Sequence, residues 1–388
     1  MKYENYLSDR VEKIPQSGIR KFFDLASATD NVVSLGVGEP DFPTPWEVRN
    51  EAIDNIKKGN TFYSPSIGME KLRKELCNYY DRRFNIKYEW DKNVIVTAGA
   101  SEAIDVVLRA IINPGDEVII LTPGYVAYEP CITLSSGTPV TIELTEEEQF
   151  KLTAKKLKNA ITKKTKALII NYPCNPTGAT MNSEDYRLLI DIIKDNNLIV
   201  ISDEIYSELT YDDEICSIAK FNEIKDQVII INGFSKAYSM TGWRLGYIFA
   251  NEIFIKAFSS IHEYAVMCAS TISQFAGIKA IKNGDSDCEK HRDSFAQRRN
   301  YIVNGLNRIG LKCTKPRGAF YVFASIRSFG LTSEEFCERL LLEYKVAVVP
   351  GVAFGECGEG YIRISYAYSI DEIKEALDRM EKFLKSLK

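Results

Sequence analysis

Short apolar runs alternate with helical patterns between residues 90 and 250, and this alternation constrains the fold more than any other feature of the chain. Runs such as 167–170 and 198–202 are apolar without a two-residue period, which is typical of strands covered on both faces. Helical patterns such as 101–112 and 183–196 lie between them, so the sequence predicts βαβ units and a mainly parallel sheet. The expected strands are 93–97, 117–121, 167–170, 198–202, 228–231 and 246–250.

The pattern changes after residue 252, where long helical stretches replace the alternation. These stretches and the elements after them are helices at 252–282, 287–309, 332–343 and 370–387 and strands near 320–324, 346–349 and 361–365. Such a run of elements is expected of a second, smaller α/β domain. We therefore predict a large domain over residues 46–282 and a small domain made of residues 1–45 and 283–388.

Composition excludes several functional classes. The 388 residues carry a formal net charge of −4, so no surplus of positive charge is present to hold a nucleic acid. No apolar stretch approaches the ~18 residues of a membrane span, and the first residues do not resemble a signal peptide. Nine cysteines without a C-x-x-C pair favour a reducing cytoplasm, and His262 and His291 are too few for a histidine-based metal site or triad. We expect a cytoplasmic protein with no metal, no membrane association and no nucleic-acid partner.

Polar residues follow several of the predicted strands, and ligands of open α/β sheets bind beyond the carboxyl ends of the strands. Small residues at 98–101 open a predicted helix, whose free N–H groups can hold a phosphate or can simply be capped by a serine. Asp203 and Tyr206 follow one strand, Lys236 follows another, and Arg244 lies eight residues beyond the lysine. Each of these has an ordinary explanation as a turn residue, a packing group or a surface charge.

Taken together, these groups fit a phosphorylated aldehyde cofactor. The amine of Lys236 can form a Schiff base with the aldehyde. The carboxylate of Asp203 can keep a pyridine nitrogen protonated, so that the ring withdraws electrons. Arg244 and the start of the helix can hold the phosphate.

Several longer segments match a known family. They are SLGVGEPDFPTP at 34–45, YSPSIGMEKLR at 63–73, NYPCNPTGA at 171–179, SDEIYSEL at 202–209, FSKAYSMTGWRLGY at 234–247 and GEGYIRISYA at 358–367. Through these segments the chain resembles the class I aminotransferases over almost its whole length. The resemblance implies an aminotransferase that uses pyridoxal 5'-phosphate (PLP). It also implies the PLP-dependent transferase fold of type I, an α/β fold whose large domain carries a mainly parallel seven-stranded sheet beside a smaller α/β domain.

The resemblance also implies roles for individual residues. Lys236 is similar to the Schiff-base lysine, which also moves the proton between the substrate and the cofactor. Asp203 is similar to the acid that pairs with the ring nitrogen. Tyr206 and Asn175 match the hydrogen-bond partners of the ring hydroxyl oxygen. Lys236, Asp203 and Tyr206 are therefore the predicted catalytic residues.

Other positions are expected, by the same resemblance, to bind cofactor or substrate. Tyr125 matches the aromatic residue that stacks on the ring. Arg363 and Gly38 match the contacts to the substrate α-carboxylate, beside Tyr125 and Asn175. Tyr63 matches a residue that reaches the phosphate in a neighbouring subunit, which implies a homodimer. The remaining expected cofactor contacts are Ala100, Ser101, Glu102, Ser235 and Arg244.

Two departures from the family pattern bear on function. Gly233 stands where many relatives have a serine that contacts the phosphate, and Ser235 is a candidate replacement. Ser101 stands where aspartate-specific prokaryotic relatives often have a lysine that reads the side-chain carboxylate. We therefore expect an aromatic or broadly hydrophobic L-amino acid as donor rather than aspartate, with 2-oxoglutarate as acceptor. The segment 19–23 is expected to supply part of an apolar wall.

Aspartate aminotransferase is the main alternative. A carbon–sulfur β-lyase of the same fold is a second one, although such enzymes usually carry a histidine where this chain has Cys174. An aminotransferase-like regulator is a third, although no basic helix-turn-helix pattern is present.

Three local expectations complete the sequence analysis. The bonds Thr122–Pro123 and Asn175–Pro176 are expected to be cis. The run 151–166 is expected to be a solvated helix. His262 and His291 are expected to be packing or surface groups.

Overall fold

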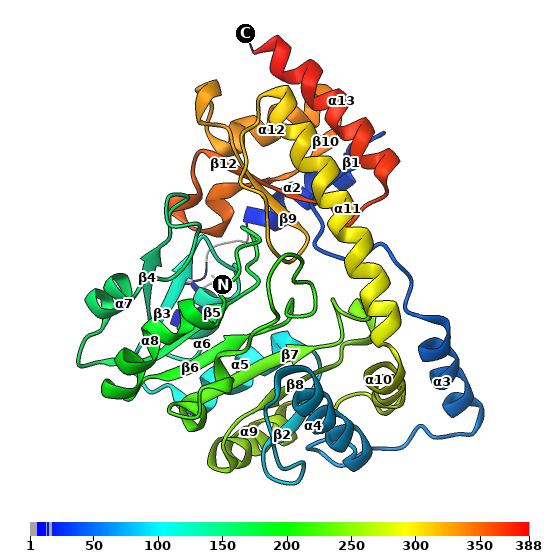
Figure 1. Cartoon of the computed structure of the whole chain (residues 1–388), viewed down its shortest axis with the longest axis vertical. Coiled ribbons are helices and arrows are strands. Elements are labelled where there is room, and N and C mark those ends of the chain that lie inside the picture. The colour runs from blue at the N-terminus through cyan, green and yellow to red at the C-terminus, as the bar shows by residue number, and fades with distance from the viewer. Residues whose placement is uncertain (1–5, 13, 15–17, 388) are drawn as a thin grey trace.

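A seven-stranded sheet organises the larger part of the molecule in the computed structural model, which describes residues 6–12, 14 and 18–387 (Figure 1). The strand order is β2-β8-β7-β6-β5-β3-β4. The pairs among β3 to β7 are parallel, and β8 runs antiparallel to both of its neighbours. The predicted mainly parallel sheet is therefore confirmed. The strands are β2 (Val94–Thr97), β3 (Glu117–Thr122), β4 (Thr138–Glu143), β5 (Thr165–Asn171), β6 (Ile199–Asp203), β7 (Val228–Gly233) and β8 (Gly246–Phe249).

Helices cover both faces of this sheet, which explains why its central strands are apolar at successive positions. Ile169 and Ile201 pack in the cluster that includes α5 (Ala100–Ile111) and α9 (Glu252–Ala265). Their neighbours Leu168 and Val200 pack in a second cluster on the other face. That face is covered by α4 (Glu70–Phe84), α8 (Ser183–Asp195) and α10 (Thr271–Asn283), and α3 (Trp46–Lys57) packs against α10. Two shorter helices connect neighbouring strands: α6 (Tyr128–Leu134) lies between β3 and β4 in the sequence, and α7 (Ala154–Ala160) lies between β4 and β5.

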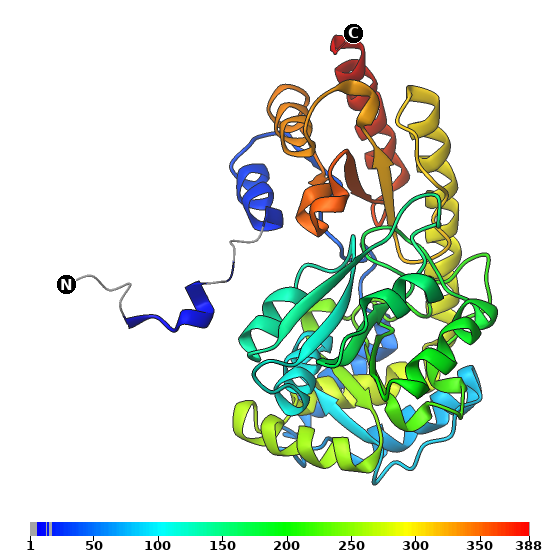
Figure 2. The same cartoon turned by 90° about the vertical axis from the view of Figure 1, so that its left-hand side faces the viewer.

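A smaller α/β part lies above the carboxyl ends of these strands (Figures 1 and 2). Its antiparallel sheet has the order β11-β12-β9, and its own apolar core contains Phe295, Phe336 and Phe383. The elements are β9 (Tyr321–Ser325), β11 (Val349–Pro350), β12 (Tyr361–Ser365), α11 (Asp285–Ile309), α12 (Ser333–Tyr344) and α13 (Ile370–Ser386).

The N-terminal segment contacts both parts. β1 (Val33–Ser34) pairs in parallel with β10 (Val346–Ala347), and Phe22 of α2 (Gly18–Ser27) is buried in the core of the smaller part. In contrast, Arg10 of α1 (Asp9–Glu12) donates a hydrogen bond of 3.1 Å to the carbonyl of Leu134 in α6. The predicted division into 46–282 and 1–45 plus 283–388 stays a prediction.

Several elements differ from the sequence expectations. The strand expected at 346–349 is two short strands, β10 and β11, which belong to different sheets. The expected helix at 252–282 is two helices, α9 and α10, separated by a turn in which Met267 has φ +72° and Ser270 caps α10. The run 151–166 is not one helix, because α7 ends at Ala160 and β5 begins at Thr165. β4 was not predicted, because an edge strand is exposed at several positions and lacks a continuous apolar run.

Both expected cis bonds, Thr122–Pro123 and Asn175–Pro176, are cis, and Tyr172–Pro173 is a third that was not expected. Across the part of the chain that the structure describes, no helix is both long enough and apolar enough to cross a bilayer.

Candidate active site

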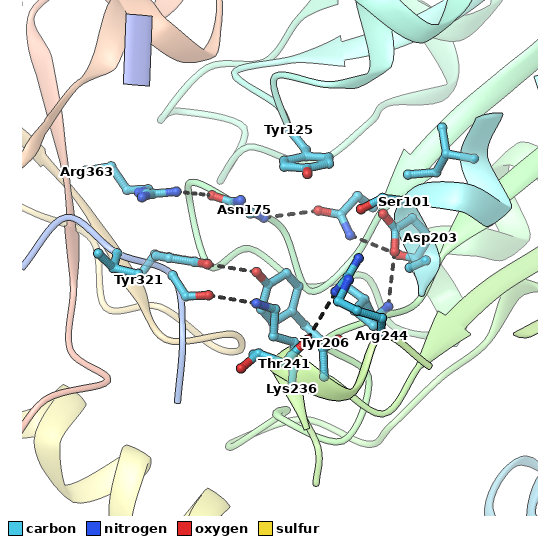
Figure 3. A pocket seen from close by; sticks show the side chains of 17 residues that line it. Ser101, Tyr125, Asn175, Asp203, Tyr206, Lys236, Thr241, Arg244, Tyr321 and Arg363 are labelled. Carbon is cyan, nitrogen blue, oxygen red and sulfur yellow. Dashed lines mark hydrogen bonds between the residues drawn. The ribbon is translucent and has the colours of Figure 1, made fainter. Parts of the chain in front are cut away.

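A cavity lies at the carboxyl ends of the central strands, where the two parts of the molecule meet (Figure 3). All of the predicted site residues except Glu102 and Tyr63 line it. These residues are Gly38, Ala100, Ser101, Tyr125, Asn175, Asp203, Tyr206, Ser235, Lys236, Arg244 and Arg363. The structure thus brings together groups that are separated by more than 300 positions in the sequence.

One end of the cavity is suited to an anion. α5 begins there, so its first backbone N–H groups have no partner within the helix and its dipole favours negative charge. The guanidinium of Arg244 lies against this helix start, since a Cβ on Gly99 would be 2.7 Å from Arg244 Nη2. The backbone of Gly246 in β8 also lies close to the helix start, since a Cβ added to Gly246 would be 2.5 Å from the carbonyl carbon of Gly99. Space therefore requires glycine at position 246, where the contact is with backbone, and the φ of +89° favours glycine at position 99.

The neighbouring strand end explains one departure from the family pattern. A Cβ on Gly233 would lie 3.0 Å from the carbonyl oxygen of Leu245, so a serine would need the backbone to shift. Ser235, the predicted replacement, lines the cavity.

Glu102 does not line the cavity. One of its carboxylate oxygens accepts a hydrogen bond from the backbone N–H of Ala98, and the other lies 2.5 Å from Nδ1 of His262. His262 is fully buried, so it is a packing group as expected. The Glu102 side chain thus shapes the turn that leads into α5, and its predicted contact with a cofactor stays a prediction.

Asp203 ends β6 and is buried at the same edge of the sheet. Its carboxylate accepts a hydrogen bond of 2.7 Å from the hydroxyl of Tyr128 and one of 3.2 Å from the backbone N–H of Ile205. Burial raises the pKa of Asp203 to about 6, although these two bonds and the charge of Lys236 act in the opposite direction. A buried carboxylate of this kind is stabilised by a positive charge placed against it.

Lys236 lies between the anion-binding end and the small-domain wall. Its amine donates a hydrogen bond of 2.7 Å to the carbonyl of Gly38. Burial lowers the pKa of Lys236 to about 8, with the charge of Glu39 acting in the opposite direction. An amine with this pKa is neutral in an appreciable fraction of molecules near neutral pH, and the neutral form is the nucleophile.

The opposite wall is built around Arg363 of β12. Its guanidinium donates 3.0 Å to Oδ1 of Asn175 and also bonds the carbonyl of Gly36, while Nε has no partner among the described residues. The guanidinium carbon lies 4.6 Å from the ring centroid of Tyr321. The hydroxyl of Tyr321 lies 2.7 Å from that of Tyr206.

Several cavity residues were not predicted. Tyr321, Asn171 and Thr241 line the cavity, and Tyr128 contacts Asp203 from behind it. Tyr321 lies within an apolar strand and Tyr128 within a helix, so nothing in their spacing separates them from core residues. Tyr63 is 85% exposed and does not line the cavity of its own chain.

Comparisons with known proteins agree with this arrangement. The family model for aminotransferases of class I and II matches residues 30–380. The chain belongs to this family. A Bacillus subtilis protein that is named as an aminotransferase, YugH, is 50% identical over 380 residues, with 98% of each chain covered. An aspartate aminotransferase of Pyrococcus abyssi is 43% identical, with 98% of this chain and 99% of the relative covered.

A solved structure extends the comparison to the fold. The aromatic aminotransferase of Pyrococcus horikoshii is 41% identical and superimposes with a TM-score of 0.90, covering 95% of this chain and 99% of the other. The protein is therefore an aminotransferase with the type I fold, and enzymes of this class depend on PLP.

The residues present fit PLP. The start of α5 and Arg244 offer an anion site for its phosphate, and the buried carboxylate of Asp203 matches a protonated ring nitrogen. The neutral amine of Lys236 is the nucleophile that an aldehyde requires, and the guanidinium of Arg363, which lines the cavity, can bind a substrate carboxylate.

Gly246→Ala tests the packing behind the anion site. The added methyl group meets the backbone of Gly99 and Ala100, so we expect the dissociation constant for PLP to rise at least about tenfold, equivalent to ~1.4 kcal/mol. Titration of the apoenzyme with PLP, followed by absorbance, measures this. Gly242→Ala is the matched control, because a Cβ there meets nothing within 4 Å. An unchanged constant in Gly246→Ala would contradict the packing argument.

Glu204, beside Asp203, is buried and does not line the cavity. Oε1 accepts hydrogen bonds from Ser202 (3.0 Å) and Ser217 (2.6 Å), and Oε2 has no partner among the described side chains and backbone. Burial raises the pKa of Glu204 from 4.5 to about 7. The folded chain therefore keeps a proton that the unfolded chain releases, and stability falls as pH rises between these two values.

Glu204→Gln removes this pH dependence. At pH 8 we expect the apoenzyme variant to be more stable than the wild type by on the order of 2–3 kcal/mol, and by less than about 1 kcal/mol at pH 5. Thermal melting of both proteins across this pH range measures the difference. Glu263→Gln, which changes an exposed carboxylate, should show no such trend. A gain that is equal at both pH values would show that Glu204 is not the titrating group.

Proposed function

We propose that this enzyme transfers the amino group of an aromatic or broadly hydrophobic L-amino acid to 2-oxoglutarate. The observation that carries the proposal is the set of cations in the cavity. Among the described residues, the cations that line it are Lys236, Arg244 and Arg363, and each has a role that does not involve the donor side chain. A second carboxylate on the donor would therefore find no free cation within this lining, and burying it without a partner from outside the lining would cost several kcal/mol.

The rest of the wall supports an apolar donor. Every donor offers the same α-amino and α-carboxylate groups, so discrimination depends on side-chain contacts. The apolar and aromatic residues that line the cavity are Val37, Ala100, Ile104, Tyr125, Ile205, Tyr206 and Tyr321. The further wall proposed from 19–23 lies outside the described side chains except for Phe22, which is buried in the small-domain core.

Aspartate remains the alternative donor, since relatives of both specificities are similar to this chain to nearly the same degree. Ser101, rather than a lysine, at the start of α5 favours the aromatic donor. The second carboxylate of 2-oxoglutarate then requires a donor group from the partner subunit or from the N-terminal segment.

We assign the chemistry as follows. When bound, PLP supplies an aldehyde carbon and a ring that withdraws electrons. Lys236 holds the cofactor through its neutral amine and moves the proton at the substrate α-carbon. Asp203 holds the ring nitrogen in its protonated form, because its buried charge is stabilised by a positive partner. Arg244, Ala100, Ser101 and Ser235 bind the phosphate.

The remaining cavity residues orient the ring and the substrate. Tyr125 lies across the cavity from Lys236 and stacks on the ring (Figure 3). Asn175 and Tyr206 bond the ring hydroxyl oxygen. Arg363 lines the cavity and binds the substrate α-carboxylate through its planar guanidinium, which suits a carboxylate. The backbone of Gly38 lies beside the same carboxylate.

A homodimer is part of the proposal. Phe62 and Tyr63 are 81% and 85% exposed, and the carbonyl of Phe62 accepts a hydrogen bond of 2.6 Å from Thr271. Tyr264 and Met267, close to Thr271 in sequence, are also exposed, so these segments present large apolar side chains to solvent. All nine cysteines lie in the described part of the chain and are unpaired, which supports a cytoplasmic location.

Lys236 is tested by borohydride reduction of the loaded enzyme, which should fix the cofactor to the peptide that contains this lysine, as mass spectrometry of digests can show. Lys236→Ala should lower transamination at least about 100-fold, because the attachment point and the proton carrier are both lost. Lys256→Ala, which changes an exposed lysine on α9, should retain activity and labelling. Wild-type turnover by Lys236→Ala would contradict the assignment of Lys236 as the lysine that holds the cofactor.

Donor preference is tested by measuring kcat/KM for tyrosine, phenylalanine, alanine and aspartate with 2-oxoglutarate under one set of conditions. We expect tyrosine or phenylalanine to exceed aspartate by at least about tenfold, or ~1.4 kcal/mol in transition-state binding. Ser101→Lys should narrow this difference, because it adds a cation at the start of α5. If aspartate leads by tenfold in the wild type, the aromatic proposal is wrong.

Substitution of Tyr63 tests whether two subunits share each active site. We expect light scattering to give about twice the 43.9 kDa chain mass. Tyr63→Phe should weaken PLP binding by at least about tenfold through the loss of one hydrogen bond to a charged group, worth about 1.5–3 kcal/mol. Tyr301→Phe on α11 is the control for a partly exposed tyrosine. A monomer in solution, or unchanged PLP affinity in Tyr63→Phe, would count against a homodimer with shared sites.

A further inference from the structure

Tyr321 of β9 brings a third phenol into the cavity, beside Tyr125 and Tyr206. Its side chain comes from the small domain, is 1% exposed, and places its hydroxyl 2.7 Å from the hydroxyl of Tyr206 (Figure 3). A Cβ on Gly38 would lie 2.1 Å from this hydroxyl, so the backbone at Gly38 closes over it. The position of the Tyr321 hydroxyl is thus fixed from two sides.

The ring of Tyr321 also contacts Arg363, the proposed binding group for the substrate carboxylate. The guanidinium carbon of Arg363 lies 4.6 Å from its ring centroid, a favourable cation–π distance. Arg363 also donates a hydrogen bond to Asn175. Arg363 is therefore connected through both Tyr321 and Asn175 with the groups that are proposed to bind the ring hydroxyl oxygen of the cofactor.

The number of protons fixes the direction of the hydrogen bond between the hydroxyls of Tyr206 and Tyr321. Each hydroxyl carries one proton, and either can donate in the bond between them. If Tyr206 donates its proton to the ring oxygen of PLP, it can only accept from Tyr321. A hydroxyl that accepts a hydrogen bond becomes a stronger donor, because bonds in a chain polarise one another.

We propose that Tyr321 is a positioning residue that donates to Tyr206, strengthens the bond from Tyr206 to the cofactor ring oxygen, and links that bond to Arg363. This inference rests on the proposed roles of Tyr206 and Arg363. The positive charge of Arg363 over the phenol ring favours donation by Tyr321. A substrate carboxylate that binds Arg363 offsets this charge and weakens the donation, so the cofactor ring responds to substrate binding in the other domain.

Tyr321→Phe tests the first part. The readout is the midpoint pH at which the yellow, protonated form of the Lys236–cofactor linkage is converted to the unprotonated form. A weaker bond from Tyr206 leaves more negative charge on the ring oxygen, which holds the neighbouring proton more strongly. We expect the midpoint to rise by about 0.5–1 pH unit, the equivalent of one hydrogen bond.

A matched control separates this effect from a general loss of structure. Tyr366→Phe removes another buried hydroxyl of the small domain, one that donates 3.1 Å to the carbonyl of Ala319 and lies outside the cavity lining. It should leave the midpoint unchanged. A shift of similar size in both variants, or no shift in Tyr321→Phe, overturns the proposal.

The double variant tests whether Tyr321 acts through Tyr206. Tyr206→Phe alone should raise the midpoint, and adding Tyr321→Phe should raise it no further. A full additional shift in the double variant means that Tyr321 acts independently, which overturns the inference alone. No shift in Tyr206→Phe overturns the proposed role of Tyr206 in the ring contact.

The link to Arg363 has its own test. An unreactive monocarboxylate, 3-phenylpropionate, should raise the midpoint in the wild-type enzyme by occupying Arg363. The rise should be smaller in Tyr321→Phe, where only the contact through Asn175 remains. An equal rise in both proteins would show that Tyr321 does not carry the signal.

Discussion

The buried carboxylate at the end of β6 is the constraint on which the rest of the site depends. Asp203 is surrounded by the apolar central strands, and burial raises its pKa to about 6 despite bonds from Tyr128 and Ile205. The strands that stabilise the sheet also remove water from this charge, so the ligand-free fold carries an unfavourable interaction. A ligand that places a positive charge there removes it, and cofactor binding is thereby linked to stability.

One segment joins this carboxylate site to the small domain. The carbonyl of Gly38 accepts from Lys236, and Thr44 donates 2.6 Å to the carbonyl of Ser239, on the loop that follows the lysine. Asp41, between them, accepts a bond of 2.7 Å from Arg298 of α11. The segment is therefore held by the large domain at two points and by the long helix at a third. The cavity is complete only when both parts of the molecule are folded, because Arg363 lies on β12 of the smaller part and Lys236 follows β7 of the large sheet.

The sequence predicted those features that apolar periodicity reports. The central strands were recognised because helices cover them on both faces, whereas the edge strand β4 is half exposed and was missed. The site residues at strand ends, such as Asp203 and Lys236, were found because the topology places strand ends together and because the family motifs mark them. The side chains that hold them, such as Tyr128 and Tyr321, were not found. Both lie in elements whose sequence pattern is that of core residues. Apolar periodicity indicates that a residue is buried, but it does not indicate which polar atom the side chain contacts.

The charges that line the cavity limit which donor side chains it can bind. In the proposed assignment, Arg244 and the N-terminus of α5 bind the phosphate, Lys236 lies beside the reacting carbon, and Arg363 binds one carboxylate. With Asp203 paired to the ring, this set is complete for a donor with a single carboxylate. Any dicarboxylate, including 2-oxoglutarate, brings one more negative charge than the described lining can pair. The groups that distinguish dicarboxylates must therefore come from outside this lining, from a partner subunit or the N-terminal segment.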